Sequence, residues 1–249
     1  MGGGPAHGRW CVIGSLAGQI HRVRQKSPCG ACRMRNANSW GSGCNDQLGG
    51  GALVTTPEDA MQRDQFLNLA GAFQGGLVLL AVLLGWLFDV NPWQYVAWDA
   101  RSWLWAGLAT LPLCSLSLLL DWSEWKLARD LRELWLSTLG PAVAQCRWWD
   151  LVLLSLLVGV SEELLFRGVV QMALARWSVV GAVLLTNALF ALVHAVTPAY
   201  AVLAGLVGLY LSLVMILVEP PNLLIPVVAH AGCDLFSFWC IRRRQQRLL

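Results

Sequence analysis

Residues 151–175 form an apolar run that is long enough to cross a lipid bilayer, yet three charged side chains lie near its middle. These side chains belong to Glu162, Glu163 and Arg167. Placing an ionisable group at bilayer depth costs about 3 kcal/mol on insertion scales, so such a group is retained where it has a partner or a function. The run therefore predicts a membrane-spanning helix whose charged residues have a partner or a function.

The composition of the whole chain is that of a membrane protein. Of its 249 residues, 56% are hydrophobic and 13% are charged, whereas soluble domains average about 25% charged residues. The formal net charge of +3 is too small to favour nucleic acid as a partner, and the eight cysteines are too scattered for a disulfide framework. Many of the tryptophans lie near the ends of apolar segments, which predicts anchoring at the membrane interface. They are Trp86, Trp93, Trp98, Trp103, Trp122, Trp125, Trp148, Trp149 and Trp177.

The apolar segments predict an all-α fold, a polytopic transmembrane helical bundle with about six spans. The predicted spans are residues 66–88, 102–120, 151–175, 177–197, 199–218 and 222–241. Pro112 lies inside the second span, where we expect it to kink the helix rather than end it.

One interfacial helix is expected between the second and third spans. Residues 121–150 carry charges of both signs, and four apolar side chains recur there at helical spacing. These are Leu127, Leu131, Leu134 and Trp135. The pattern predicts an amphipathic helix that lies along the membrane surface and is broken at Gly140-Pro141.

The predicted domain organisation follows from these segments. Residues 1–60 are a disordered or organelle-targeting extension, and residues 61–149 hold two spans and the amphipathic connection. Residues 150–241 form a four-helix membrane core, and residues 242–249 are a basic tail. Cys29 and Cys32 form a CxxC, for which a metal or redox role is the minor alternative to an unstructured tail. With six spans both termini and the basic loop share one side, which the positive-inside rule makes cytoplasmic.

Six residues of the types Asp, Glu, His, Lys and Arg lie within the predicted spans of the four-helix core. Most fall into pairs with i, i+4 spacing, which places both members on one face of a helix. The pairs are Glu163/Arg167, Phe190/His194 and His230/Asp234. Ser155, Gly159 and Glu162 also share a face, and the small residues on this face predict close approach by a neighbouring helix.

Two imidazoles and several carboxylates that converge in an apolar cavity are the parts of a water-activating site. One carboxylate can accept a proton from water that an imidazole holds in place, and the second imidazole can donate to a developing oxyanion. Two alternatives stay open at this point. A Glu–Arg pair can simply join helices, and a proton-coupled transporter uses similar residues, although the chain shows no internal repeat.

Zinc is the rival catalyst, because His and Glu are its ligands. A site of His194, His230 and Glu162 is the candidate, but the chain has no HExxH motif, so we expect no metal cofactor. The evidence for nucleophilic catalysis is weaker still. Ser155, Ser161 and Cys233 lie near the motifs without a GxSxG context.

The three motifs together resemble a known family. EExxxR at 162–167, FxxxH at 190–194 and HxxxD at 230–234, in this order on successive apolar helices, are similar to the CPBP intramembrane proteases. This family includes the type II CAAX prenyl endopeptidases and the bacterial Abi, or bacteriocin-immunity, proteins. The resemblance covers residues 150–241, the four-helix core, and identifies that core as CPBP-like and catalytic.

The resemblance implies a role for each motif residue. Glu162 would be the general base and would work with His194 on the attacking water, while His230 and Asp234 would form the oxyanion site. Glu163 and Arg167 would be supporting residues, and Phe190 would pack near the scissile bond. The implied activity is that of a glutamic-type intramembrane endopeptidase that acts on a membrane-tethered peptide or protein.

One departure from the family pattern concerns Asp234. The prenyl endopeptidases carry Asn at this position, and an ionised Asp cannot donate to an oxyanion. Asp also occurs in the bacterial members, so the resemblance implies a bacterial plasma membrane protein, with a plastid membrane as the alternative. The alternative function is a non-proteolytic scaffold or immunity-type protein that binds a partner through the same cavity.

Overall fold

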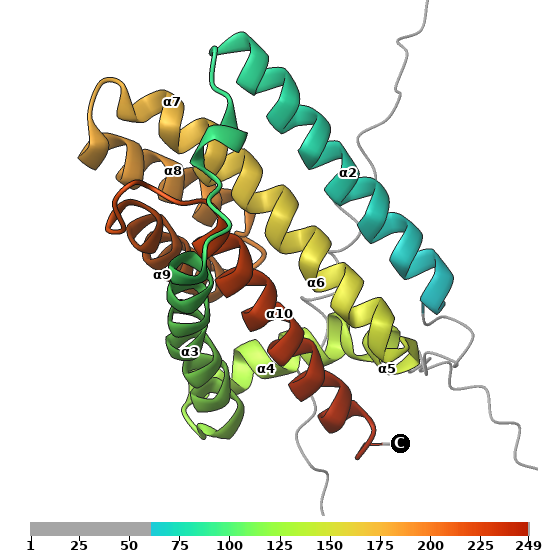
Figure 1. The fold of residues 1–249 in the computed structure, drawn as a ribbon. Coiled ribbons are helices and arrows are strands. Elements are labelled where there is room, and N and C mark those ends of the chain that lie inside the picture. Colours follow the sequence, from blue (N-terminus) through green and yellow to red (C-terminus); the bar gives the residue numbers. More distant parts are fainter. Residues whose placement is uncertain (1–60, 249) are drawn as a thin grey trace, which may run out of the picture. The chain divides into compact units, whose positions relative to one another are not determined.

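A computed structural model describes residues 61–248, and every described element is helical (Figure 1). The predicted extension 1–60 and its CxxC lie outside the described residues. The elements are α2 (Arg63–Leu87), η2 (Pro92–Tyr95), α3 (Ala100–Trp122), α4 (Lys126–Thr138), α5 (Gly140–Gln145), α6 (Trp148–Glu163), η3 (Leu164–Gln171), α7 (Met172–Ala175), α8 (Val179–Val193), α9 (Pro198–Ile216) and α10 (Leu224–Gln245). The predicted all-α polytopic bundle is confirmed for this part of the chain.

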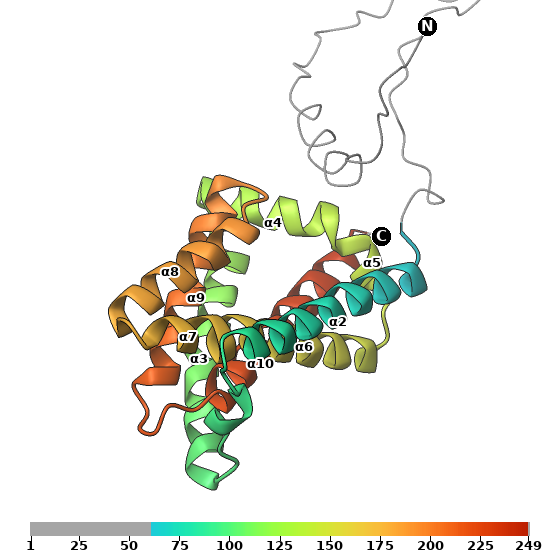
Figure 2. The ribbon, with the colours of Figure 1, turned by 90° about the horizontal axis from the view of Figure 1, so that it is seen from above.

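Four of the long helices lie side by side in the order α2, α6, α10 and α3, as Figure 1 shows. The α8–α9 pair packs against η3 and α10, and α4 runs across from α9 to α5 (Figure 2). α10 therefore touches most of the bundle, which places His230 and Asp234 within reach of α6.

Polar side chains begin three of these helices. Asp99 accepts a hydrogen bond from Ser102 N at 2.9 Å at the start of α3, and Ser178 accepts one from Gly181 N at 3.1 Å at the start of α8. Thr197 caps α9 in the same way, with Pro198 as the first helical residue. These caps satisfy backbone N–H groups that have no partner in the first helical turn.

Four helices, namely α2, α3, α9 and α10, are long and apolar enough to cross a membrane. They correspond to four of the six predicted spans, and α3 continues through Pro112, as expected. All nine predicted tryptophan anchors are exposed on the protein surface.

The predicted span 151–175 is continuous but not a single α-helix. α6 passes directly into the π-helical segment η3 and then into α7. Seven of the eight residues of η3 are buried, because α2, α8 and η2 all pack against it. Single π turns inside helices are frequent at functional sites.

The prediction of a full span over 177–197 is wrong. α8 ends at Val193, and His194 is the residue that caps its C-terminus. At about 1.5 Å per residue such a helix measures roughly 22 Å, less than the roughly 30 Å of the hydrocarbon layer. The chain turns here because Thr197 and Pro198 already begin α9. His194 therefore lies at a helix end rather than within a span.

The amphipathic connection is confirmed as a helix, α4, which ends before the predicted break. The buried residues of α4 are Ala128 and Leu131, whereas Leu127 is 54% exposed on the protein surface. Arg132 donates from Nη1 to the carbonyl oxygens of Leu120 and Asp121, each at 2.8 Å. A cation at the C-terminus of α3 stabilises the free carbonyl groups there.

Candidate functional site

Glu163, the last residue of α6, joins two helical segments through one carboxylate oxygen. Its Oε1 accepts hydrogen bonds from Arg167 Nη1 at 2.9 Å and from Nδ1 of His230 at 2.7 Å. Because an ionised carboxylate only accepts, Nδ1 carries the proton in the His230 contact. The contact between Glu163 and His230 links the EExxxR motif to the HxxxD motif. The i, i+4 spacing within each motif does not predict this link.

Arg167 is fully buried and surrounded by partners. Besides Glu163, its guanidinium donates from Nη2 to the carbonyl oxygen of Gly208 at 2.8 Å and to Asn187 Oδ1 at 3.3 Å. Its Cζ also lies 4.5 Å from the centre of the Phe190 ring. A buried guanidinium is stable only when paired and hydrogen-bonded in this manner.

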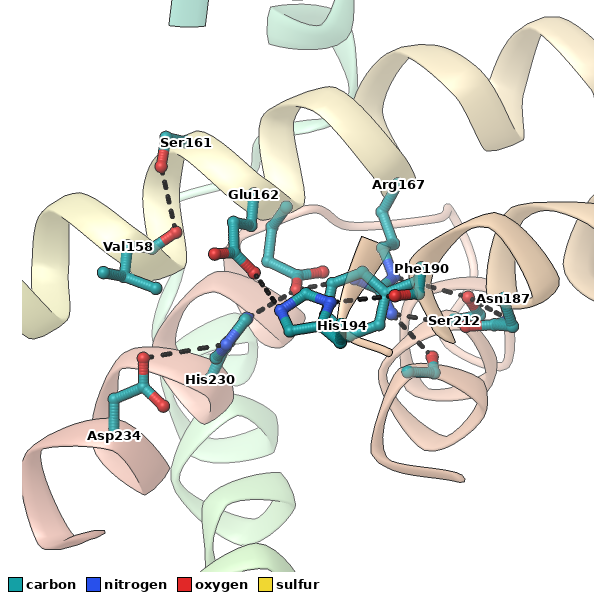
Figure 3. A network of polar contacts seen from close by, with 12 residues as sticks. Val158, Ser161, Glu162, Arg167, Asn187, Phe190, His194, Ser212, His230 and Asp234 are labelled. Atoms are coloured by element: carbon teal, nitrogen blue, oxygen red, sulfur yellow. Dashed lines mark hydrogen bonds and ion pairs between the residues drawn. The ribbon is translucent and has the colours of Figure 1, made fainter. Parts of the chain in front are cut away.

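Asn187 and Ser212 complete the surroundings of Arg167. Asn187 Nδ2 donates to Ser212 Oγ at 2.9 Å and to the carbonyl oxygen of Val183 at 2.7 Å. These contacts leave Asn187 Oδ1 directed at Arg167 (Figure 3). The guanidinium is therefore held from α6, α8 and α9 together.

Phe190 is the aromatic centre of the site. Its ring lies 4.3 Å from the His194 ring and 6.4 Å from the His230 ring, measured between centroids, and it is 3% exposed. It meets Phe166 edge-on at 5.0 Å. The ring thus contacts both the buried Arg167 and the ring of His194.

Glu162 and His194 face each other across the site (Figure 3). His194 Nε2 lies 3.7 Å from Glu162 Oε2, and His194 Nδ1 lies 2.8 Å from the carbonyl oxygen of Phe190. A carbonyl oxygen only accepts, so Nδ1 carries the proton and Nε2 is the atom directed at Glu162. Within residues 61–248, Oε2 of Glu162 is buried and has no hydrogen-bond partner.

His230 and Asp234 form the third pair. His230 Nε2 lies 3.7 Å from Asp234 Oδ2, on the opposite side of the ring from the Glu163 contact. All three predicted i, i+4 pairings are therefore observed, and the seven predicted residues converge.

Side-chain exposure rises steadily across the site. Glu163 and Arg167 are 0% exposed, Glu162 and His230 are about one-tenth exposed at 9% and 10%, and Asp234 reaches 26%. The site is therefore accessible from the side of His194 and Asp234, and the Glu163–Arg167 pair lies at its fully buried end.

Close approach of α6 and α10 depends on Gly159. A Cβ at this position would lie 3.0 Å from the Cβ and the N atom of Ala231 and from the carbonyl oxygen of Val227. Ser155, Gly159 and Glu162 are all buried, and the predicted close approach of a neighbouring helix is observed at Gly159.

Reasoning from the sequence missed four residues of this network, namely Gln74, Asn187, Gly208 and Ser212, and it treated Ser161 only as a weak candidate nucleophile. Only Asp, Glu, His, Lys and Arg were counted within the spans, yet an amide or hydroxyl group inside an apolar run carries the same signal. Asn187 precedes Phe190 by three residues on the same helix, so a search that included neutral polar groups would find it.

The candidate zinc ligands do not converge on one point. Among residues 61–248, no group of three or more His, Cys, Asp or Glu side chains converges closely enough to hold a metal ion. His194, His230 and Glu162 thus do not form the candidate zinc site in this conformation.

Comparison with known proteins gives one match. Residues 144–236 match the family model of the Rce1-like type II CAAX prenyl endopeptidases, and all three motifs fall inside this range. No match was found among curated proteins or among solved structures. The resemblance carried by the three motifs is confirmed by this match: residues 144–236 are a region similar to the type II CAAX prenyl endopeptidases, within an integral membrane protein.

Proposed function

We propose that the protein is an intramembrane endopeptidase that hydrolyses a peptide bond of a membrane-associated substrate with water activated by Glu162 and His194. The observation that carries the proposal is the different environment of the two adjacent glutamates. In the described part of the chain Oε2 of each glutamate has no hydrogen bond. The Glu163 side chain is 0% exposed and its Oε1 is held by Arg167 and His230, whereas the Glu162 side chain is 9% exposed and its Oε2 lies 3.7 Å from Nε2 of His194. A base must have a free lone pair within reach of the attacking water, so Glu162, whose free oxygen faces His194, is the glutamate suited to accept a proton.

In the proposed reaction, water lies between Glu162 and His194. The water donates one hydrogen bond to Nε2 of His194, and Glu162 takes its other proton as the oxygen attacks the carbonyl carbon. Glu162 then gives this proton to the amide nitrogen, and the carbon–nitrogen bond breaks. Both steps conserve atoms and charge without an external reactant besides water.

The oxyanion formed in this attack needs a donor. Nδ1–H of His230 donates a hydrogen bond to Glu163 and keeps its proton, so Nε2 can donate to the oxyanion when the ring is an imidazolium held between the two carboxylates of Glu163 and Asp234. In this proposal Asp234 orients His230, and the Glu163–Arg167 pair fixes the position of the His230 ring. Phe190 forms the apolar wall beside the scissile bond.

Activity assays of purified protein in lipid vesicles test this mechanism on membrane-tethered peptides, with and without a prenyl group. Glu162→Gln and His194→Ala should each lower cleavage about 10²–10⁴-fold, the usual contribution of general base catalysis. Glu219→Gln is the matched control, because Glu219 is exposed in the loop before α10. Full activity of both site variants would overturn the proposal. Activity lost to a chelator and restored by zinc would require a metal-dependent mechanism instead.

The rival function, a scaffold or immunity-type protein, predicts a different result in the same assay. No cleavage of any tethered peptide, together with a partner whose binding survives Glu162→Gln, would favour it. For location we propose a bacterial plasma membrane, with a plastid membrane as the alternative, and the basic tail 242–249 on the cytoplasmic side. A reporter fused after residue 249 that is active only in the cytoplasm tests this orientation.

A further inference from the structure

Gln74 is a buried amide at the middle of α2, a helix that is otherwise largely exposed. The buried residues of α2 are Phe66, Gln74, Ala81 and Gly85. Their spacing forms one stripe along the helix, and α6 and η3 pack against α2. Gln74 is the polar member of this stripe and is 6% exposed. An amide in an apolar interface is costly unless it has hydrogen-bond partners.

The partners of Gln74 are Glu162, the first residue of the EExxxR motif, and Ser161, the residue before it. Ser161 Oγ lies 2.5 Å from Gln74 Oε1, and Gln74 Nε2 donates to Glu162 Oε1 at 3.5 Å. The orientation of the amide follows from chemistry. A carboxylate only accepts, so the NH₂ group must face Glu162, and the amide oxygen must face the hydroxyl group of Ser161.

This geometry distinguishes the two oxygens of Glu162. Oε1 faces the Gln74 donor, and Oε2 faces His194. A carboxylate with a donor on one oxygen has a restricted rotation, and its second oxygen stays directed at the site where water is activated. Positional errors of about 1 Å in reacting groups can cost 10²-fold in rate.

We propose that Gln74 is a positioning residue that holds the Glu162 carboxylate in its productive orientation. The inference rests on the proposed role of Glu162 as the base. Because Gln74 lies outside residues 144–236, it assigns α2 a part in the active site beyond membrane anchoring.

Two variants of Gln74 test the proposal in the vesicle assay. Gln74→Met removes the donor at nearly constant volume and should lower kcat at least tenfold with KM changed less than threefold. Gln171→Met is the matched control, since Gln171 is 1% exposed in the same bundle and its amide atoms have no hydrogen bond within residues 61–248. Cleavage by this control should stay within threefold of the unmodified protein.

Gln74→Glu supplies a readout that a purely structural role would not move. At neutral pH a second carboxylate beside Glu162 should lower kcat at least tenfold, because like charges repel and the donor is lost. At acidic pH the introduced side chain becomes protonated and donates again, so its activity relative to the unmodified protein should rise. The other titratable groups that face Glu162 are common to both proteins, and the ratio removes their effect. They are Glu163 and Arg167 of α6 and η3, His194 at the end of α8, Tyr200 of α9, and His230 and Asp234 of α10.

The outcomes separate this inference from the proposed function. If Glu162→Gln is inactive while both Gln74 variants match the Gln171→Met control, Gln74 does not position the base. If Glu162→Gln is active, the proposed function itself is wrong. Should the Gln74 variants fail to fold, Ser161→Ala replaces them, since it frees the amide to rotate and should lower kcat at least threefold. An unchanged kcat in Ser161→Ala would overturn the inference.

Discussion

Nδ1 of His230 lies 2.7 Å from Oε1 of Glu163, and the same oxygen accepts from Arg167 at 2.9 Å. One carboxylate thus ties α10 to α6 and neutralises a fully buried arginine. Glu163 is thus fully buried and bonded to two other motif residues, and it stands beside the proposed catalytic base.

Removing one member of the buried Glu163–Arg167 pair should lower the free energy of unfolding more than removing both. Glu163→Met leaves the Arg167 charge buried without its carboxylate, which costs about 3–5 kcal/mol, whereas apolar replacement of both partners is often close to neutral. We expect Glu163→Met to unfold well before the unmodified protein, and Glu163→Met with Arg167→Met to regain most of that stability without activity. Denaturant unfolding in detergent micelles measures both. A double variant no more stable than the single one would show that the ion pair is not the cause.

Gly208 should tolerate no side chain. A Cβ there would lie 2.7 Å from Oδ1 of Asn187 and 2.9 Å from Nη2 of Arg167, so Gly208→Ala must displace the guanidinium. Overpacking of this kind costs about 1–3 kcal/mol, and we expect cleavage to fall as well. Gly107→Ala is the control, because a Cβ at Gly107 meets no atom within 4 Å and alanine favours the helix. Equal melting temperatures and activities for the two variants would contradict the packing argument.

Gly159 sets the separation of α6 and α10. Because the nearest neighbours of its absent Cβ include backbone atoms at 3.0 Å, Gly159→Ala should push α10 away and lengthen the Glu163–His230 contact. Activity should fall about tenfold or more, as expected for misplaced reacting groups. Adding Ala231→Gly removes the facing Cβ and should restore part of the activity. Gly75→Ala on α2, where the added atom meets nothing within 4 Å, should be harmless. No recovery in the double variant would place the defect elsewhere.

Asp234 should be replaceable by Asn but not by Leu. Asn keeps an oxygen near Nε2 of His230 and adds a donor, so Asp234→Asn is expected to retain cleavage within about tenfold. Asp234→Leu removes every polar contact of the side chain and should lose about 10²-fold or more, the scale of one oxyanion-site group. Initial rates on the tethered peptide decide between them. Equal losses in the two variants would mean that the negative charge itself is required.

The start of α3 should weaken in acid. The hydrogen bond from Ser102 N holds the pKa of Asp99 below its ordinary value, so its contribution to stability is fully present above pH of about 4 and is lost as the pH falls through the lowered pKa. Asp99→Asn keeps a capping oxygen that does not titrate. The stability of the unmodified protein relative to Asp99→Asn should therefore decrease between pH 5 and pH 2. Thermal unfolding of both proteins in detergent micelles measures this difference. A pH-independent difference would contradict the role of this cap.

Much of the membrane fold could be predicted from the sequence, because span length and helical spacing are local properties. Four long apolar helices and the i, i+4 pairs Glu163/Arg167 and His230/Asp234 are present as expected. The length of α8 was predicted wrongly, because apolarity continues past Val193 while the cap of the next helix already turns the chain.

The chain by itself determined which polar groups share a helix face, because that depends only on the 3.6-residue repeat. It could not distinguish Glu162 from Glu163, which are adjacent and identical. Only the tertiary structure gives them different surroundings, by placing Arg167 and His230 on one carboxylate and Gln74 and His194 beside the other. The physical reason is that a buried charge acquires its role from the partners that other helices bring to it, and those contacts are remote in sequence.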